Sequence, residues 1–191
     1  MAYSFQKSKD LFNTYIFETK SNVFYSLKFK HSPFMLGDNK KEFSESIFEF
    51  VIEVFFNPED KLPAKDDLIS ETIHQILLDF FQSKNETTCL YICDSSNGKQ
   101  LVRRRKFNQW FDYFVKSNFV KYDEILFDKN DNEFPFSLIM QKHNKYIPEV
   151  IAAFQEIINS FTSMIVQNDE NKLKTLESLY LRGKFKQHNY N

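Results

Sequence analysis

The chain has 191 residues, of which 42% are hydrophobic and 27% are charged. This composition is typical of a globular protein and excludes wholesale disorder, and the length favours one domain that needs no disulfide or metal for stability. The 25 Lys and Arg residues nearly balance the 26 Asp and Glu residues, which excludes a surface that is basic throughout. Any anion-binding site must therefore be local.

The start of the chain has no apolar run typical of a signal peptide, and no stretch approaches the length of apolar sequence that spans a membrane. Cys89 and Cys93 lie four residues apart in an expected strand, roughly 13 Å along it, which is too far for a disulfide or a shared metal ion. We therefore expect reduced, buried thiols in a cytoplasmic protein without a membrane partner.

Apolar and polar residues alternate near the start of the chain, which predicts a hairpin. A less regular strand around residues 14–18 precedes a polar turn at 20–22, and residues 3–5 are expected to add an edge strand. The alternation is clearest in the second arm of the hairpin, whose apolar residues are Val23, Tyr25, Leu27 and Phe29.

Helical spacing follows the hairpin and predicts two helices. In the first, Ser44 would be the N-cap, Phe43 would pack on Phe48, and Asn57-Pro58 would end the helix. The second would be capped by Asp66 or Asp67. The apolar positions are Phe43, Ile47, Phe50, Val51 and Val54 in the first helix, and Ile69, Ile73, Ile76, Leu77 and Phe80 in the second.

The second half of the chain predicts a strand, a helix, a hairpin and a long final helix. The strand covers 88–93 and is followed by a polar turn at 94–98 and an aromatic helix. The hairpin joins 119–128 to 133–141, where Pro135 suggests an edge strand. The final helix opens near Pro148.

The predicted fold is α+β, with a mainly antiparallel sheet of about five strands and helices packed on one face. The expected order is ββααβαββα plus a C-terminal helical tail. We expect one domain over residues 1–166 and a partly helical tail over 167–191.

One segment breaks a local rule. Between residues 99 and 106 the chain carries five cations and no acid, at the expected start of the aromatic helix. Positive charge in the first turn opposes the helix dipole, and such an uncompensated conflict indicates a functional site. Arginine forks near free amides suit phosphate or carboxylate oxygens. The anion-binding candidates are Lys99, Arg103, Arg104, Arg105 and Lys106.

Two other interpretations of these cations stay open. In the first, the helix begins only at Phe107, so that the cations lie outside the unfavourable field of the helix dipole. In the second, the cations pair with the acidic hairpin. The acidic residues of that hairpin are Asp123, Glu124, Asp128, Asp131 and Glu133.

Other candidates are weaker. Asp94, at a strand end beside the cations, is a possible catalytic carboxylate, although such a residue more often bonds to its own turn. Tyr113 is a possible stacking residue, whereas Trp110 is expected in the core. The four histidines show no metal-ligand spacing, and we expect no metal, no cofactor and no assigned catalytic residue.

Three strings of the sequence carry a resemblance to a known family: Phe24 to Phe29, Tyr91 to Asp94, and Arg105-Lys106-Phe107 followed by Trp110-Phe111. Through them the chain resembles a bacterial family catalogued as a domain of unknown function, number 6169. The resemblance covers roughly residues 3–161 and implies a cytoplasmic bacterial protein, but it implies no substrate and no catalytic residue.

The sequence supports three hypotheses of function. The first is a non-enzymatic interaction module that binds a protein or an anionic ligand through the basic helix start. The second is a nucleic-acid-processing enzyme that uses Asp94 and the neighbouring cations. The third is a homo-oligomer or a toxin–antitoxin-type partner that uses the last helix and the tail.

Overall fold

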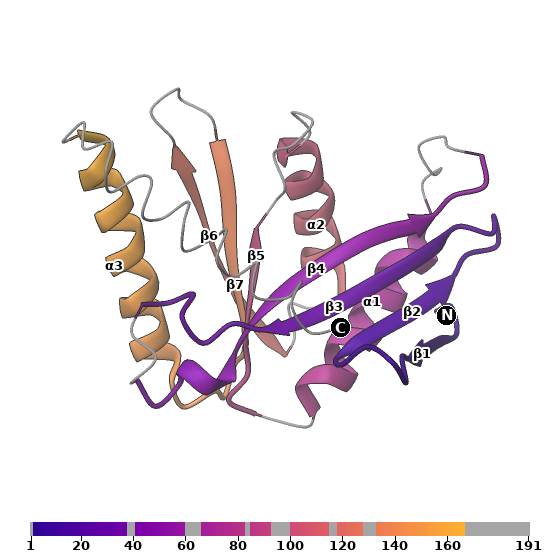
Figure 1. The fold of residues 1–191 in the computed structure, drawn as a ribbon, viewed down its shortest axis with the longest axis horizontal. Helices are drawn as coiled ribbons and strands as arrows, with labels where there is room; N and C mark the ends of the chain where they lie inside the picture. Colours follow the sequence, from indigo (N-terminus) through magenta and orange to yellow (C-terminus); the bar gives the residue numbers. More distant parts are fainter. Residues whose placement is uncertain are drawn as a thin grey trace.

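The computed structural model describes residues 2–37, 41–59, 66–82, 85–92, 100–114, 118–127 and 133–166. The described residues form a seven-stranded sheet in the order β1-β2-β3-β4-β5-β7-β6, together with three α-helices (Figure 1). The strands are β1 Phe5–Lys7, β2 Thr14–Glu18, β3 Phe24–His31, β4 Ile47–Phe56, β5 Thr88–Ile92, β6 Phe119–Phe127 and β7 Glu133–Gln141, and the helices are α1 Asp67–Gln82, α2 Gln100–Phe114 and α3 Ile147–Val166.

The sheet is mostly antiparallel, which confirms the predicted α+β class. The parallel neighbours β4 and β5 are joined through α1. The described residues form seven strands where about five were predicted, because the predicted order left out the edge strand expected near residues 3–5, which is present as β1, and because one expected helix is a strand. The observed order is therefore ββββαβαββα.

The early hairpin is confirmed. β2 pairs with β3 from Thr14↔Lys28 to Glu18↔Phe24, and the turn is closed by the Thr19 amide, which donates to the Val23 carbonyl at 3.0 Å. Asn22 has a φ of 56°, a left-handed conformation that asparagine tolerates better than most residues.

The expected helix after residue 44 is wrong. Ser44–Ser46 form a short 3₁₀ turn whose N-cap is Phe43 and not the predicted Ser44, and the next ten residues form β4. The helical spacing coincided with an alternation of Phe48, Phe50 and Ile52 along one face of a strand. Nearly every residue of this strand is β-branched or aromatic, and such residues favour strands over helices. Pairing with β3 on one edge and with the start of β5 on the other decides the conformation.

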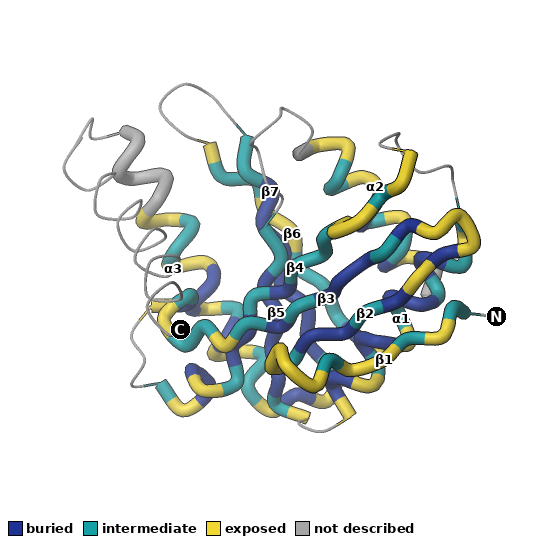
Figure 2. The backbone as a smooth tube through the Cα atoms, turned by 45° about the vertical axis from the view of Figure 1, so that its right-hand side comes forward, coloured by how far each residue is buried: buried dark blue, intermediate teal, exposed yellow. Residues whose placement is uncertain are grey.

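Helices pack on both faces of the sheet, so the prediction of helices on one face is also wrong. Cys89 of β5 and Ile139 of β7 belong to the core that includes α1 and α2, whereas Leu90 and Leu138 pack with α3. These neighbours point to opposite faces because side chains alternate along a strand. Figure 2 shows the buried residues concentrated along the middle of the sheet. None of the helices that the described residues form is long and apolar enough to cross a membrane.

Of two smaller predictions, one is confirmed and the other is wrong. The Asp66 side chain accepts the Leu68 amide at 2.9 Å, which confirms the predicted cap of α1. Pro135 does not mark an edge strand, since β7 lies between β5 and β6. The described pairing of β5 with β7 ends at Ile92↔Phe136, so Pro135 lies one residue beyond it, where its missing amide donor breaks none of those bonds.

Candidate functional site

The helix that carries the basic segment is fixed to the sheet by aromatic side chains. The Phe107 ring stacks on Tyr91 of β5 with ring centroids 4.1 Å apart, and lies 6.1 Å from Phe50 of β4. Phe107 and Phe111 are buried in the core shared with α1. α2 thus lies across the junction between β4 and β5.

The four described cations of the basic segment, Arg103 to Lys106, lie within α2. The helix is already formed at Gln100, so the alternative in which it begins only at Phe107 is wrong. Arg103 and Arg104 are half-buried and Arg105 and Lys106 are exposed, and the first described turn of the helix contains no acidic residue.

Exposed apolar residues precede these cations. Leu101 is 47% exposed and Val102 is 66% exposed. We define the basic face of α2 as Leu101, Val102, Arg104, Arg105 and Lys106. Arginine is enriched at protein interfaces, and the exposed apolar side chains beside it add surface that a partner can remove from water.

Lys106 adds a partly desolvated cation to the basic face. Its ammonium nitrogen lies 5.2 Å from the centre of the Trp110 ring, a cation–π geometry. Burial around the ammonium group lowers the pKa of Lys106, although much of the residue is exposed. Trp110 itself packs against the core, as predicted.

One acidic residue of the hairpin, Asp123, has its partners within the hairpin itself. Asp123 on β6 forms an ion pair with Lys121 and accepts a hydrogen bond of 2.6 Å from the buried Ser137 hydroxyl on β7. The Lys121 ammonium also donates to Asn108 of α2 at 2.7 Å. Among the described residues, no ion pair joins Arg104, Arg105 or Lys106 to this hairpin.

Asn108, Lys121, Asp123 and Ser137 form a polar cluster that sequence reasoning missed. The Lys121 side chain is only 6% exposed, and its nitrogen lies 5.8 and 5.5 Å from the centres of the Phe107 and Phe111 rings. The cross-strand pair Asp123↔Ser137 was the available signal, but it needs the register of the hairpin, which composition does not give. The cluster connects α2 to β6 and β7.

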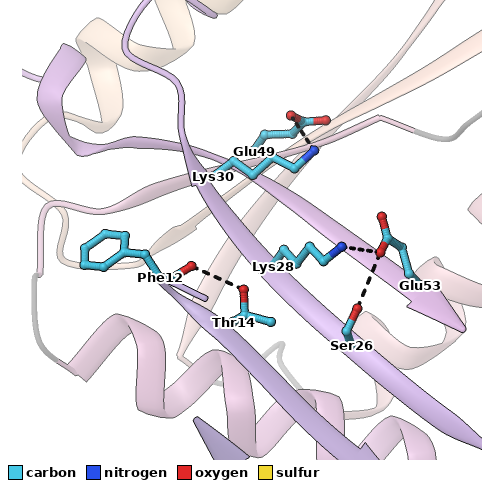
Figure 3. Close-up of polar contacts among 7 residues, drawn as sticks. All are labelled: Phe12, Thr14, Ser26, Lys28, Lys30, Glu49 and Glu53. Carbon is cyan, nitrogen blue, oxygen red and sulfur yellow. Dashed lines mark hydrogen bonds and ion pairs between the residues drawn. The ribbon is translucent and has the colours of Figure 1, made fainter. Parts of the chain in front are cut away.

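A second polar surface lies on the face of β3 and β4 opposite α1 (Figure 3). Lys28 forms an ion pair of 2.5 Å with Glu53, and Lys30 forms one of 3.8 Å with Glu49. The Ser26 hydroxyl also donates to Glu53, at 3.5 Å. Because each lysine is matched by a glutamate on the neighbouring strand, this face has little net charge and favours no anion.

Several sequence candidates lie outside the described residues. These are Lys99, Asp94 and Cys93, together with the side chain of Tyr113. Within the part of the chain that the structure describes, no group of three His, Cys, Asp or Glu side chains lies close enough to hold a metal ion.

His74 provides a test of the packing between α1 and α2, where it lines a small hollow with Ser70 and Trp110. Burial lowers the pKa of His74, and the nearby Glu71 opposes this effect more weakly.

The unfolded chain therefore binds more protons below its own histidine pKa of about 6.5. We expect the free energy of unfolding to be highest above that pH and to fall as the pH drops toward the lower pKa of the folded state. His74→Gln should reduce this fall, measured by urea unfolding at about pH 7.5 and about pH 5. An equal fall in the free energy of unfolding in wild type and His74→Gln would contradict the burial of His74 between α1 and α2.

These features define a protein of mixed α+β fold, in which the described residues place cations and exposed apolar side chains on α2 and ion-paired lysines and glutamates on β3 and β4. Residues 65–156 match the model of a family described as a family of unknown function (DUF6169), which confirms the resemblance. The match includes β5 and the whole basic face of α2, whereas the early hairpin, which also carried the resemblance, lies outside it. No curated protein and no solved structure matches the chain.

Proposed function

We propose that the protein is a non-enzymatic interaction module that binds an anionic partner through the basic face of α2. One observation carries this proposal: α2 is helical from Gln100 on, so its cations lie on a formed helix beside exposed Leu101 and Val102. Five cations without an acid are concentrated in a chain whose net charge is −1, which makes this segment a local attractor for anions.

The rigidity of the surrounding structure supports the proposal. Phe107 and Phe111 fix the buried side of α2, and Lys121 holds Asn108. A helix held in this way presents its exposed side chains without a large ordering cost on binding. The buried, reduced Cys89 is consistent with a cytoplasmic location, and the resemblance supports a bacterial origin.

The test compares two double variants of equal charge change. Arg104→Glu with Arg105→Glu reverses the basic face, and Lys9→Glu with Lys20→Glu reverses two exposed lysines in the loops before and after β2. The probes are labelled poly-glutamate and a short single-stranded RNA, with binding measured against salt.

We expect wild type and the Lys9, Lys20 variant to bind an anionic probe at low salt. The Arg104, Arg105 variant should bind at least about tenfold more weakly, since charge-assisted contacts each contribute on the order of 1–3 kcal/mol. Equal losses in both variants, or no binding by wild type at low salt, would sink the proposal.

A further inference from the structure

β4 has a long stretch without a described strand on one edge. β5 pairs with β4 only over Ile47–Glu49, whereas β3 pairs along its other edge as far as Phe56. Figure 1 shows β4 turning away from β5 beyond their contact. Among the described residues, the part of β4 from Phe50 to Phe56 is therefore a strand with one edge unpaired.

The hydrogen-bond pattern shows which main-chain groups face this edge. The Ser32 amide donates to the Ile47 carbonyl at 2.9 Å, so Ile47 directs its main chain toward β3. In an antiparallel pair the direction alternates, so Glu49, Val51 and Glu53 also face β3. The main-chain groups that face the free edge of β4 are those of Phe50, Ile52 and Val54.

The last three side chains of this edge lack the usual protection. Val54, Phe55 and Phe56 are 45%, 52% and 53% exposed, in a run without charge or proline. The outer strands of the sheet differ, since β1 has only three residues and β6 carries Lys121, Asp123 and Glu124. Exposed edges normally carry such charges or are short, because an unprotected edge pairs with other chains.

The rings at this edge also indicate a strand-like ligand. The register shifts between Phe24 and Tyr25, and the ring centroids of Phe55 and Phe56 each lie 5.8 Å from that of Phe24. These rings lie on the face of the sheet opposite Ile52. Exposed apolar groups thus lie on both faces of the edge, since Val54 is on the face of Ile52. An added strand would contact both faces, whereas a docked helix would cover only one.

α2 lies behind the point where β4 and β5 separate, because Phe107 contacts Phe50 and Tyr91. The turn before Phe107 carries the cations of the basic face. We infer that the partner is an extended, acidic segment of another protein, which pairs with the free edge of β4 and sets its carboxylates against α2. This inference rests on the proposed function. A second copy of the chain fits less well, because it would add a second set of the same cations.

The test selects short random peptides on the full-length chain and measures the affinity of the selected peptides by fluorescence anisotropy. Val54→Pro removes one main-chain donor from the free edge, and Val54→Ala is the matched control that keeps the donor. We expect the selected peptides to have apolar residues at alternate positions and acidic residues at one end. Val54→Pro should bind these peptides about tenfold more weakly than wild type, and the affinity of Val54→Ala should be within about twofold of wild type.

A second measurement remains decisive if Val54→Pro is poorly folded. N-methylation of one set of alternate residues in the selected peptide should abolish binding, and N-methylation of the other set should not. Peptides that tolerate both sets and bind Val54→Pro like wild type would overturn the inference, and so would the selection of no peptide.

The two proposals fail separately. If the strand tests fail but Arg104→Glu with Arg105→Glu still weakens binding of the anionic probes, the proposed function stands and the strand site is wrong. If the strand tests succeed and the charge reversal changes nothing, β4 binds an extended segment without the basic face, and the proposed function is wrong together with the acidic character inferred for the partner.

Discussion

Phe29→Ala is expected to lower the free energy of unfolding by about 3–5 kcal/mol, the range for removing a buried phenyl ring. Phe29 on β3 is only 2% exposed. Its ring stacks on Phe80 of α1 at 3.7 Å and lies 5.0 Å from Phe50 and 5.8 Å from Tyr15. Removing it leaves a cavity between the sheet and α1, and the surrounding rings are held by other partners and cannot collapse into it.

The matched control is Phe12→Ala, the same substitution at a residue that is 88% exposed. We expect a change below about 0.5 kcal/mol there. Stability is measured by urea unfolding of wild type and the two variants. We expect the free energy of unfolding to depend equally on urea concentration in all three proteins, so that the midpoints report stability alone. A loss of less than about 1.5 kcal/mol in Phe29→Ala would contradict the assignment of this ring to a tightly packed core.

The sequence predicted those elements whose pattern has one interpretation. Alternation in 23–29 and helical spacing in 69–80 each fit a single period, and both elements are present. Ile47–Phe56 fits two periods, because almost every position is apolar and only Glu49 and Glu53 mark the outer face. For such a run, residue type and tertiary pairing decide, and the pairing partners β3 and β5 are distant in sequence.

The placement of the helices could not be predicted because it depends on the order of the strands. β7 lies between β5 and β6, and that arrangement decides that Leu138 faces α3 while Ile139 faces α1 and α2. The cations of the candidate site were found from their lack of acidic neighbours in the chain. The polar cluster beneath α2 was not, because Asn108 and Ser137 are ordinary residues until the register brings them to Lys121 and Asp123.

The ion pair in that cluster supports the last prediction. Asp123→Asn should lower the free energy of unfolding by about 2–3 kcal/mol, because it leaves the Lys121 ammonium enclosed without a countercharge. Asp123 is 29% exposed, so water moderates the loss below that of a fully buried pair. Asn108 and the two rings solvate the ammonium only in part.

Replacing both partners separates the cost of an unpaired charge from the net contribution of the pair. Lys121→Met with Asp123→Asn should be more stable than Asp123→Asn alone, since a thioether suits the space between Phe107 and Phe111 and no charge is then enclosed. The exposed pair Lys145–Glu86, at 2.7 Å, is the control: Glu86→Gln should leave unfolding almost unchanged. If Asp123→Asn were as harmless as Glu86→Gln, Lys121 would have to be solvated, and the cluster would not hold α2 against the sheet. The basic face would then lie on a helix fixed by its aromatic residues alone.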